Sequence, residues 1–382
     1  MKLIGLLLIV LLISATGVLS IYIYGATLSA SAKEEFFFGV SFGQETVEEA
    51  KLLIDEVKDY TNFFLINSLS ITTNETALNE VSEYAVKADL KFMVFFDIFL
   101  RRRTVTFRHP WHQTWLDTAK ERYGDKFLGV YLFDEPGGKQ IDNSTLLADA
   151  SDYSDAANSF ATAISSRMEI QYLKNMSIPV FTSDYALYWF DYLAGYDTVF
   201  VELGWDQNTA KHIALCRGAA NVQSKEWGAI ITWTYYEPPY LASGPEILEE
   251  MLTAYRAGAK YIIIFNYAED PETGKPYCIL KEEHFTAMQQ FWTYIHNHPE
   301  NHGQIKGQVA FVLPKDYGWG IRHREDNIWG LWPADEKAPL IWGNVSKLIQ
   351  KYGLELDIVY DDARFDYEEK YSKVYLWDST IN

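Results

Sequence analysis

The sequence predicts a (β/α)₈ barrel of the TIM type with a small C-terminal α/β unit, preceded by a membrane-spanning or signal segment. A length of 382 residues fits one large domain and one small one, because such a barrel uses about 250 residues. Eight short apolar runs recur, each followed by a stretch of helical periodicity, which is typical of a parallel α/β sheet. The alternative is an open doubly wound sheet, but SFGQETVEE after the first run lacks a glycine-rich phosphate motif.

Composition and charge argue against a disordered protein and against a nucleic-acid-binding protein. Hydrophobic residues make up 48% of the chain and charged residues 22%, which excludes an intrinsically disordered protein. The formal net charge is −19, from 33 Lys and Arg against 52 Asp and Glu. Such a chain repels a phosphate backbone, so nucleic acid is not an expected partner.

The N-terminal region, residues 1–32, contains a segment long enough to cross a membrane. Leu3–Leu28 is free of charged residues and exceeds the apolar core of an ordinary signal peptide. Ala30, Ser31 and Ala32 nevertheless form an A-x-A cleavage pattern. We expect an uncleaved anchor in the membrane, with a cleaved signal as the alternative. In both cases the globular part lies outside the cytoplasm, either anchored or secreted.

Two further features bear on an extracytoplasmic location. Cys216 and Cys278 permit at most one disulfide, and two buried free thiols are the simpler expectation. Four N-x-S/T sequons agree with an exported glycoprotein. They begin at Asn74, Asn143, Asn175 and Asn344.

The eight candidate strands follow one another between residues 33 and 300, the predicted barrel domain. They are Phe36–Gly43, Asn62–Ser68, Lys91–Phe99, Phe127–Asp134, Pro179–Asp184, Thr198–Trp205, Trp227–Tyr236 and Tyr261–Tyr267.

The helices between the strands have recognisable starts. Thr46 and Glu49 form a capping box, Asn74 precedes a second amphipathic segment, and Gly244 with Pro245 introduces a third. A polar stretch, NHPENHGQIKG, places a domain boundary near residue 300. Residues 301–382 then form the small α/β unit, with a helix that ends at Tyr352.

Functional residues of such a barrel stand at the carboxyl ends of its strands. In this sequence those ends carry carboxylates and aromatic residues. They are Asp97 after strand three, Asp134 and Glu135 after strand four, Glu202 and Trp205 after strand six, Trp233, Tyr235 and Glu237 after strand seven, and Asn266 and Tyr267 after strand eight.

This set of residues favours glycosidic bond cleavage. The reaction needs one carboxyl group to protonate the leaving oxygen and a second to act as a nucleophile or to activate water. Glu135 and Glu237 are the predicted catalytic pair, because strands four and seven face each other across the barrel mouth. Aromatic side chains suit the C–H faces of sugar rings, so the remaining residues at the strand ends are expected to bind substrate.

At these residues the sequence resembles the clan A glycoside hydrolases. Asp134, Glu135 and Pro136 are similar to the clan's Asn-Glu-Pro motif at the end of strand four, except that Asp replaces Asn. The resemblance covers residues 36–297. It implies that Glu135 is the acid/base and Glu237 the nucleophile. Asp134 beside the acid/base is expected to raise its pKa.

Other interpretations stay open. Glu202 can replace one member of the pair, and a Glu before Pro can simply mark a loop. Arg101, Arg102, Arg103 and Arg108 form a basic cluster that is either solvated or recognises an acidic sugar. His109 and His112 lack a third ligand, so neither a metal nor a cofactor is expected. The aromatic segment 315–336 can form a substrate wall or pack against the barrel.

The sequence therefore predicts an extracytoplasmic glycoside hydrolase that cleaves a polysaccharide or glycan with retention of configuration. The alternative is a catalytically inactive barrel that binds carbohydrate at the cell surface.

Overall fold

The computed structural model describes residues 35–96, 109–205, 207–267 and 273–381. The predicted membrane segment, Leu3–Leu28, lies outside these residues. Within them, no helix is both apolar and long enough to cross a bilayer.

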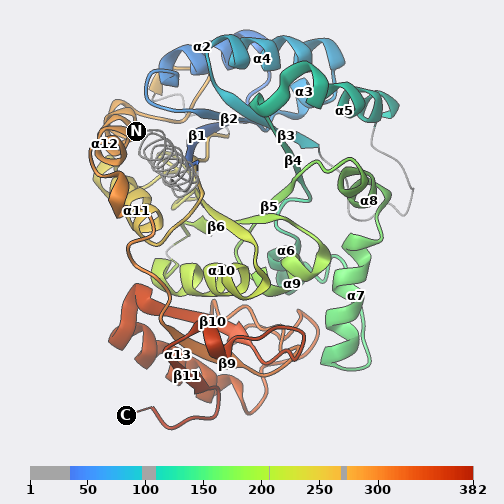
Figure 1. Ribbon diagram of the computed structural model, residues 1–382, viewed down its shortest axis with the longest axis vertical. Helices are drawn as coiled ribbons and strands as arrows, with labels where there is room; N and C mark the ends of the chain where they lie inside the picture. Colours follow the sequence, from blue (N-terminus) through green and yellow to red (C-terminus); the bar gives the residue numbers. More distant parts are fainter. Residues whose placement is uncertain (1–34, 97–108, 206, 268–272, 382) are drawn as a thin grey trace, which may run out of the picture. The chain divides into compact units, whose positions relative to one another are not determined.

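Eight parallel strands close into a barrel, which confirms the predicted fold (Figure 1). Pairing of the first strand with the last closes it, for example between Phe37 and Tyr261. The strands are β1 (Phe37–Phe42), β2 (Phe63–Ile66), β3 (Lys91–Phe96), β4 (Phe127–Leu132), β5 (Val180–Asp184), β6 (Thr198–Leu203), β7 (Glu226–Ile231) and β8 (Tyr261–Ile264).

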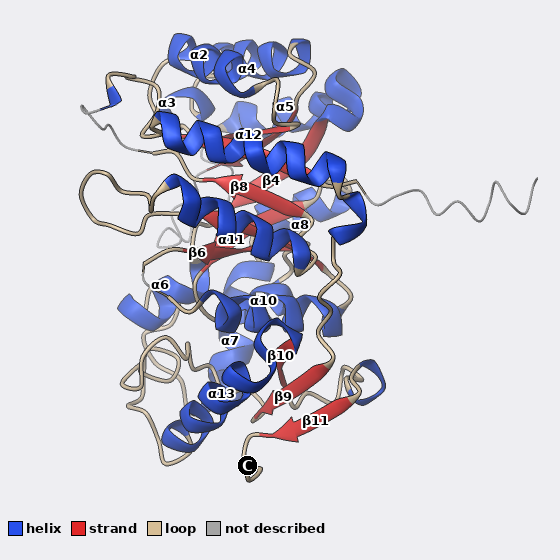
Figure 2. Cartoon of the chain, turned by 90° about the vertical axis from the view of Figure 1, so that its left-hand side faces the viewer, coloured by secondary structure: helices blue, strands red, loops and turns tan. Residues whose placement is uncertain are grey.

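Helices surround the strands (Figures 1 and 2). Thr46 and Glu49 make the expected capping box, and the Asn74 side chain accepts N–H bonds at the start of α4. The helices of the barrel are α2 (Val47–Val57), α3 (Leu69–Thr72), α4 (Glu75–Lys87), α5 (Pro110–Tyr123), α6 (Pro136–Asn143), α7 (Tyr153–Ser165), α8 (Met168–Asn175), α9 (Tyr188–Ala194), α10 (Thr209–Gln223), α11 (Gly244–Arg256) and α12 (Glu282–Asn297).

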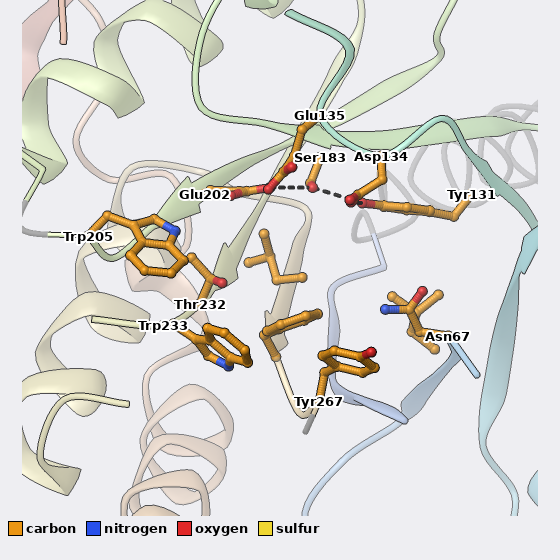
Figure 3. Close-up of a pocket in the computed structure, with 13 residues that line it drawn as sticks. Asn67, Tyr131, Asp134, Glu135, Ser183, Glu202, Trp205, Thr232, Trp233 and Tyr267 are labelled. Carbon is orange, nitrogen blue, oxygen red and sulfur yellow. Dashed lines mark hydrogen bonds between the residues drawn. The ribbon is translucent and has the colours of Figure 1, made fainter. Parts of the chain in front are cut away.

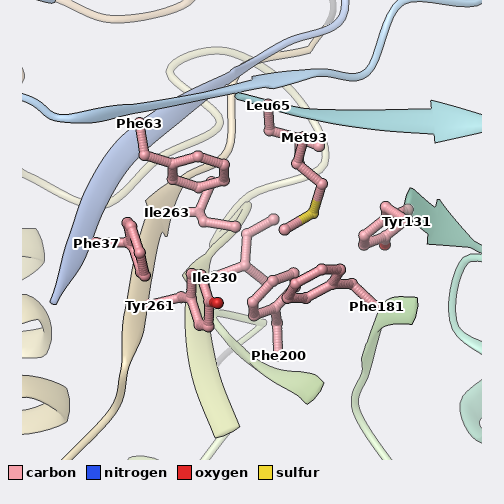
Figure 4. Packing of buried hydrophobic residues seen from close by; sticks show 10 residues of the cluster. All are labelled: Phe37, Phe63, Leu65, Met93, Tyr131, Phe181, Phe200, Ile230, Tyr261 and Ile263. Carbon is pink, nitrogen blue, oxygen red and sulfur yellow. The ribbon is translucent and has the colours of Figure 1, made fainter. Parts of the chain in front are cut away.

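The barrel interior is filled largely by aromatic rings rather than by branched aliphatic side chains (Figure 4). Phe37 stacks on Tyr261 with ring centroids 4.8 Å apart, and Phe181 and Phe200 stack at 5.8 Å. Gly228 makes room for this packing, because a Cβ there would come within 2.6 Å of the Phe200 ring. The interior is therefore a packed core that closes the bottom of any cavity at the mouth.

The C-terminal residues form a three-stranded parallel sheet with the order β10-β9-β11. Its elements are β9 (Val309–Leu313), α13 (Ala338–Tyr352), β10 (Leu356–Tyr360) and β11 (Lys373–Leu376). A buried ion pair of 2.7 Å joins Arg217 of α10 to Asp357 of β10. Residues 37–382 thus form one compact unit, while the boundary near residue 300 remains a prediction.

The aromatic segment 315–336 packs against the barrel. Trp319 and Trp329 are fully buried, and Trp329 contacts Phe190 of α9 with ring centroids 4.5 Å apart. The Gln140 side chain of α6 donates a hydrogen bond of 2.8 Å to the Trp329 carbonyl. The packing role is therefore observed, and the segment contributes no residue to the cavity described below.

The cysteines and sequons are also placed. Cys216 and Cys278 are both free and buried. The asparagines at 74, 143 and 175 are exposed. Asn344 is buried, and its amide donates to the carbonyls of Trp377 and Ser379, so this sequon is closed to modification in the folded protein.

Candidate active site

A cavity of about 280 Å³ opens at the carboxyl ends of the barrel strands (Figure 3). Carboxylates gather on one side of it and aromatic rings on the other. Its lining residues are Leu65, Asn67, Tyr131, Asp134, Glu135, Ser183, Glu202, Trp205, Ile230, Thr232, Trp233, Phe265 and Tyr267.

The loop after β4 holds two of the carboxylates in an unusual backbone conformation. Phe133 and Glu135 both have positive φ angles, 56° and 54°, which side chains other than glycine rarely adopt. Two hydrogen bonds to β5 maintain this loop: the Glu135 N–H donates to the Ser183 carbonyl at 3.1 Å, and the Thr182 hydroxyl donates to the Phe133 carbonyl at 2.6 Å. Such strain is typical of functional sites.

Three carboxyl groups meet in the cavity. Asp134, Glu135 and Glu202 each have an oxygen within 4.8 Å of the others. The ammonium of Lys139, one turn into α6, lies 2.8 Å from Asp134 and 3.1 Å from Glu135. Oxygen atoms of this set could ligate a cation, but Lys139 already supplies a positive charge to two of its members.

Burial and mutual repulsion shift the pKa values of these groups. Burial, followed by the charge of Asp134, raises the pKa of Glu135 to about 7. Asp134 thus raises the pKa of Glu135, as expected from the sequence. Burial, then Glu135 and Asp134, raises the pKa of Glu202 well above its ordinary value. Near neutral pH the site thus retains at least one carboxyl proton.

A chain of hydrogen bonds links two of the carboxyl groups. The Ser183 hydroxyl donates a hydrogen bond of 2.6 Å to the Glu202 carboxyl, and its oxygen lies 2.8 Å from the Tyr131 hydroxyl. The Tyr131 hydroxyl in turn donates a hydrogen bond of 2.7 Å to Asp134. Both hydroxyl-bearing side chains are buried, with relative exposures of 2% and 3%.

A fourth carboxylate, Asp184, supports the loop from below. It accepts the N–H groups of Gly137 and Gly138, at 2.5 and 2.8 Å, in the first turn of α6. Both glycines are needed for this approach, since a Cβ on Gly138 would come within 2.1 Å of the Tyr185 ring. Asp191 packs beside Asp184; burial, followed by the charge of Asp184, raises the Asp191 pKa well above its usual range.

Aromatic residues line the side of the cavity opposite the carboxylates (Figure 3). Trp205 lies edge-on to Trp233 with ring centroids 6.0 Å apart, and Trp233 and Tyr267 are stacked at 6.5 Å. Tyr267 is 50% exposed, so its ring is available to a ligand at the rim. Such faces are suited to the C–H surfaces of a sugar.

The structure does not bring Glu237 to the cavity. Strand β7 ends at Ile231, five residues before the predicted end at Tyr236. The following segment folds back on itself. The N–H groups of Thr234 and Tyr235 both donate to the Tyr240 carbonyl, and the Tyr240 N–H donates to the Glu237 carbonyl. Glu237 is exposed on this turn and lines no part of the cavity. Glu202 occupies the position next to Glu135 instead.

The other predicted site residues divide into three groups. Asp134, Glu202, Trp205, Trp233 and Tyr267 line the cavity. Tyr235 is 48% exposed outside it, and Asn266 is fully buried, with its side chain bound to Gln44 and the Ile279 N–H. Asp97 lies outside the described residues, as do Arg101, Arg102, Arg103 and Arg108.

Of the two histidines considered as a metal pair, His112 has a structural role. His112 is buried, stacks on Phe96 with ring centroids 4.1 Å apart, and shares a hydrogen bond of 2.8 Å with the Thr72 carbonyl. His109 precedes α5 and lies 5.1 Å from the His112 ring, centroid to centroid.

Sequence reasoning missed Asn67, Tyr131 and Ser183. Asn67 directly follows β2 and Ser183 stands at the end of β5, so the rule for strand ends could have found both. Tyr131 lies within β4, where only the alternation of inward-facing residues marks it.

Solved structures with a similar fold include two structures of one protein. GH5_18 from Streptomyces cattleya in complex with GlcNAc has a TM-score of 0.54 and 12% identity, covering 91% of this chain and 99% of that one. A variant of GH5_18 in complex with Manβ1-4GlcNAc has a TM-score of 0.52 and 11% identity, covering 90% and 99%. The fold resembles that of clan A glycoside hydrolases. No family model and no curated protein sequence matches the chain.

Proposed function

We propose that the protein is a retaining glycoside hydrolase with Glu135 as the acid/base and Glu202 as the nucleophile. The observation that carries the proposal is that an oxygen of Glu135 lies within 4.8 Å of an oxygen of Glu202 inside a cavity lined by aromatic rings, which is closer than inversion requires. Retaining enzymes hold their carboxyl groups about 5–5.5 Å apart, whereas inverting enzymes leave about 6.5–9.5 Å for a water molecule.

The division of roles follows from the surroundings of each group. Glu135 stands at the end of strand four, where the clan carries its acid/base, and its pKa of about 7 suits a general acid near neutral pH. Its partner Lys139 stabilises the carboxylate after the proton has left. Glu202 lies deeper, at 4% exposure, where its carboxylate would face the cationic anomeric carbon of the transition state.

Hydrolysis is tested with aryl glycosides of mannose, glucose and N-acetylglucosamine and of their disaccharides, with product configuration read by NMR. We expect Glu135→Gln and Glu202→Gln each to lower kcat by at least about 10³-fold. Glu237→Gln is the matched control, because it removes an exposed carboxylate outside the cavity. A loss with Glu237→Gln but not with Glu202→Gln would restore the pair predicted from the sequence.

A second assay identifies the nucleophile directly. A 2-fluoro glycoside of the accepted sugar forms a stable ester with the nucleophile of a retaining enzyme, and peptide mapping locates the ester. We expect it on Glu202. If the wild-type protein binds glycans and hydrolyses none of the panel, the inactive carbohydrate-binding barrel becomes the better account.

We also propose that the globular part lies outside the cytoplasm, tethered by residues 3–28. The support is the charge-free run and the exposure of three of the four sequons. Expression of the full chain followed by alkaline extraction of membranes tests the tether. Release of a protein that begins at Lys33 would show cleavage after Ala32 instead.

A further inference from the structure

The buried nucleophile proposed above poses a proton problem. Glu202 must be ionised to attack the anomeric carbon, yet its carboxyl lies at 4% exposure beside two other carboxyl groups. For Glu202 to transfer its proton directly to water, solvent would have to reach the bottom of a cavity that the sugar fills. The chain of hydrogen bonds from Glu202 through Ser183 and Tyr131 offers a route inside the protein.

We propose that the hydroxyls of Ser183 and Tyr131 relay a proton between the carboxyl groups of Glu202 and Asp134, so that Glu202 is ionised when it acts as a nucleophile. This role rests on the proposed function and extends it to two further residues. The three oxygen-to-oxygen distances, 2.6, 2.8 and 2.7 Å, are all short enough for proton transfer along the chain (Figure 3).

The protons balance in this scheme. Before reaction the Ser183 hydroxyl turns from Glu202 to Tyr131. The protonated Glu202 carboxyl then donates to Ser183, the Ser183 hydroxyl donates to Tyr131, and the Tyr131 hydroxyl donates to Asp134. When each proton moves along its own hydrogen bond, Glu202 becomes a carboxylate and Asp134 a carboxylic acid. Only O–H bonds have changed, and both hydroxyls are restored.

Lys139 keeps the charge balanced during the following step. It lies 2.8 Å from Asp134 and 3.1 Å from Glu135, so it can pair with either carboxylate. As Glu135 gives its proton to the leaving oxygen, the glycosidic C–O bond breaks and a Glu202 oxygen bonds to the anomeric carbon. Glu135 is then the ionised partner of Lys139 and Asp134 the neutral one.

The second step reverses the relay. Water attacks the anomeric carbon while Glu135 accepts its proton, and the bond between the sugar and Glu202 breaks. The released Glu202 carboxylate regains its proton from Asp134 through Tyr131 and Ser183. The charged groups that face the relay from neighbouring elements are Glu135 and Lys139 on the α6 side and Asp184 on β5.

Two conservative variants interrupt the relay at different places. Tyr131→Phe removes one hydroxyl and keeps the ring, whose contacts with Phe95 and Phe200 are preserved. Ser183→Ala removes the other hydroxyl. We expect each to lower kcat by about 100-fold or more, because a positioned proton-transfer group contributes about 10²- to 10⁴-fold. We also expect the activity of both to rise at higher pH, where solvent can take the proton.

The double variant Ser183→Ala/Tyr131→Phe distinguishes a relay from two separate hydrogen bonds. If either substitution alone interrupts the relay, the second substitution has no further effect on kcat. The kcat of the double variant should therefore match that of the less active single variant within about threefold. The control is Thr232→Val, which removes another hydroxyl from the cavity wall. Its effect should multiply with that of Tyr131→Phe. Multiplicative losses in the Ser183 and Tyr131 pair would overturn the relay while leaving the hydrolase function intact.

An infrared measurement tests the relay without any substrate. The carboxylic acid band of Glu202 is assigned by its loss in Glu202→Gln and is followed as a function of pH. Tyr131→Phe removes a group that does not contact Glu202 directly, so a changed titration of the Glu202 band is expected only if the chain is continuous. An unchanged titration would refute the relay, whether or not the wild-type protein hydrolyses the panel.

Discussion

Because the pKa of Glu135 is raised, ionisation of this carboxyl group should destabilise the folded protein measurably. This carboxyl titrates near pH 7 in the folded protein and near 4.5 when unfolded. Between these values the unfolded state has lost the proton and the folded state keeps it, so stability falls as pH rises through that window. The linkage relation gives a loss of about 1 kcal/mol at pH 5 and about 3 kcal/mol at pH 8.

Glu135→Gln removes this penalty, because a neutral amide of the same shape does not ionise. We expect the variant to unfold with a free energy about 3 kcal/mol greater than the wild type at pH 8 and less than about 1 kcal/mol greater at pH 5. Urea titrations at the two pH values measure both differences. Glu237→Gln serves as the control, since it makes the same substitution at an exposed position outside the cavity.

The outcome that would refute the reasoning is a Glu135→Gln protein no more stable than the wild type at pH 8. In that case the carboxylate is well solvated or fully compensated by Lys139, which lies 3.1 Å away. Glu135 would then lack the raised pKa that suits it to act as a general acid.

Three further predictions concern the loop after β4, the C-terminal sheet and the rim of the cavity. Asp184→Asn should lower the free energy of unfolding by about 2 kcal/mol, because the amide loses acceptors for the N–H groups of α6. Asp191→Asn should lower it by less than about 1 kcal/mol, because the amide resembles the neutral acid. Urea titration measures both changes. Arg217→Met leaves Asp357 buried without its partner and should cost about 3–5 kcal/mol, measured the same way. Tyr267→Ala should raise KM for an accepted glycan about 3- to 10-fold with little change in kcat, measured by steady-state kinetics.

The strands could be predicted because their pattern is local. Each of the eight apolar runs overlaps one barrel strand, and the N-caps Thr46 and Asn74 mark the helix starts as expected. Strand order and closure then follow from the short right-handed connections of a βα repeat. These features depend on neighbouring residues, which a sequence displays directly.

The position of Glu237 could not be predicted, because it depends on where β7 stops pairing with its neighbours. The run from Trp227 to Tyr236 has the composition of one long strand, but the ladder with β6 ends at Ile231. Thr232 and Trp233 make the last backbone hydrogen bonds to the chain that continues from β6, and from Thr234 onward the chain bonds to itself in a turn closed by Tyr240. Register and loop direction are set by tertiary contacts, so the sequence indicated the carboxylates of the rim but not which two would meet.

The hydrogen bond from the Gln140 side chain to the Trp329 carbonyl joins two parts of the chain that are far apart in the sequence. Helix α6 starts immediately after Glu135 and carries Gln140. The same short helix therefore connects the Glu135 carboxyl group to the aromatic segment 315–336. Loosening of residues 315–336 would release that helix and the loop with positive φ angles at its start. We therefore expect a single cooperative unfolding transition for the barrel and the C-terminal sheet, with a sugar bound in the cavity protecting both from proteolysis.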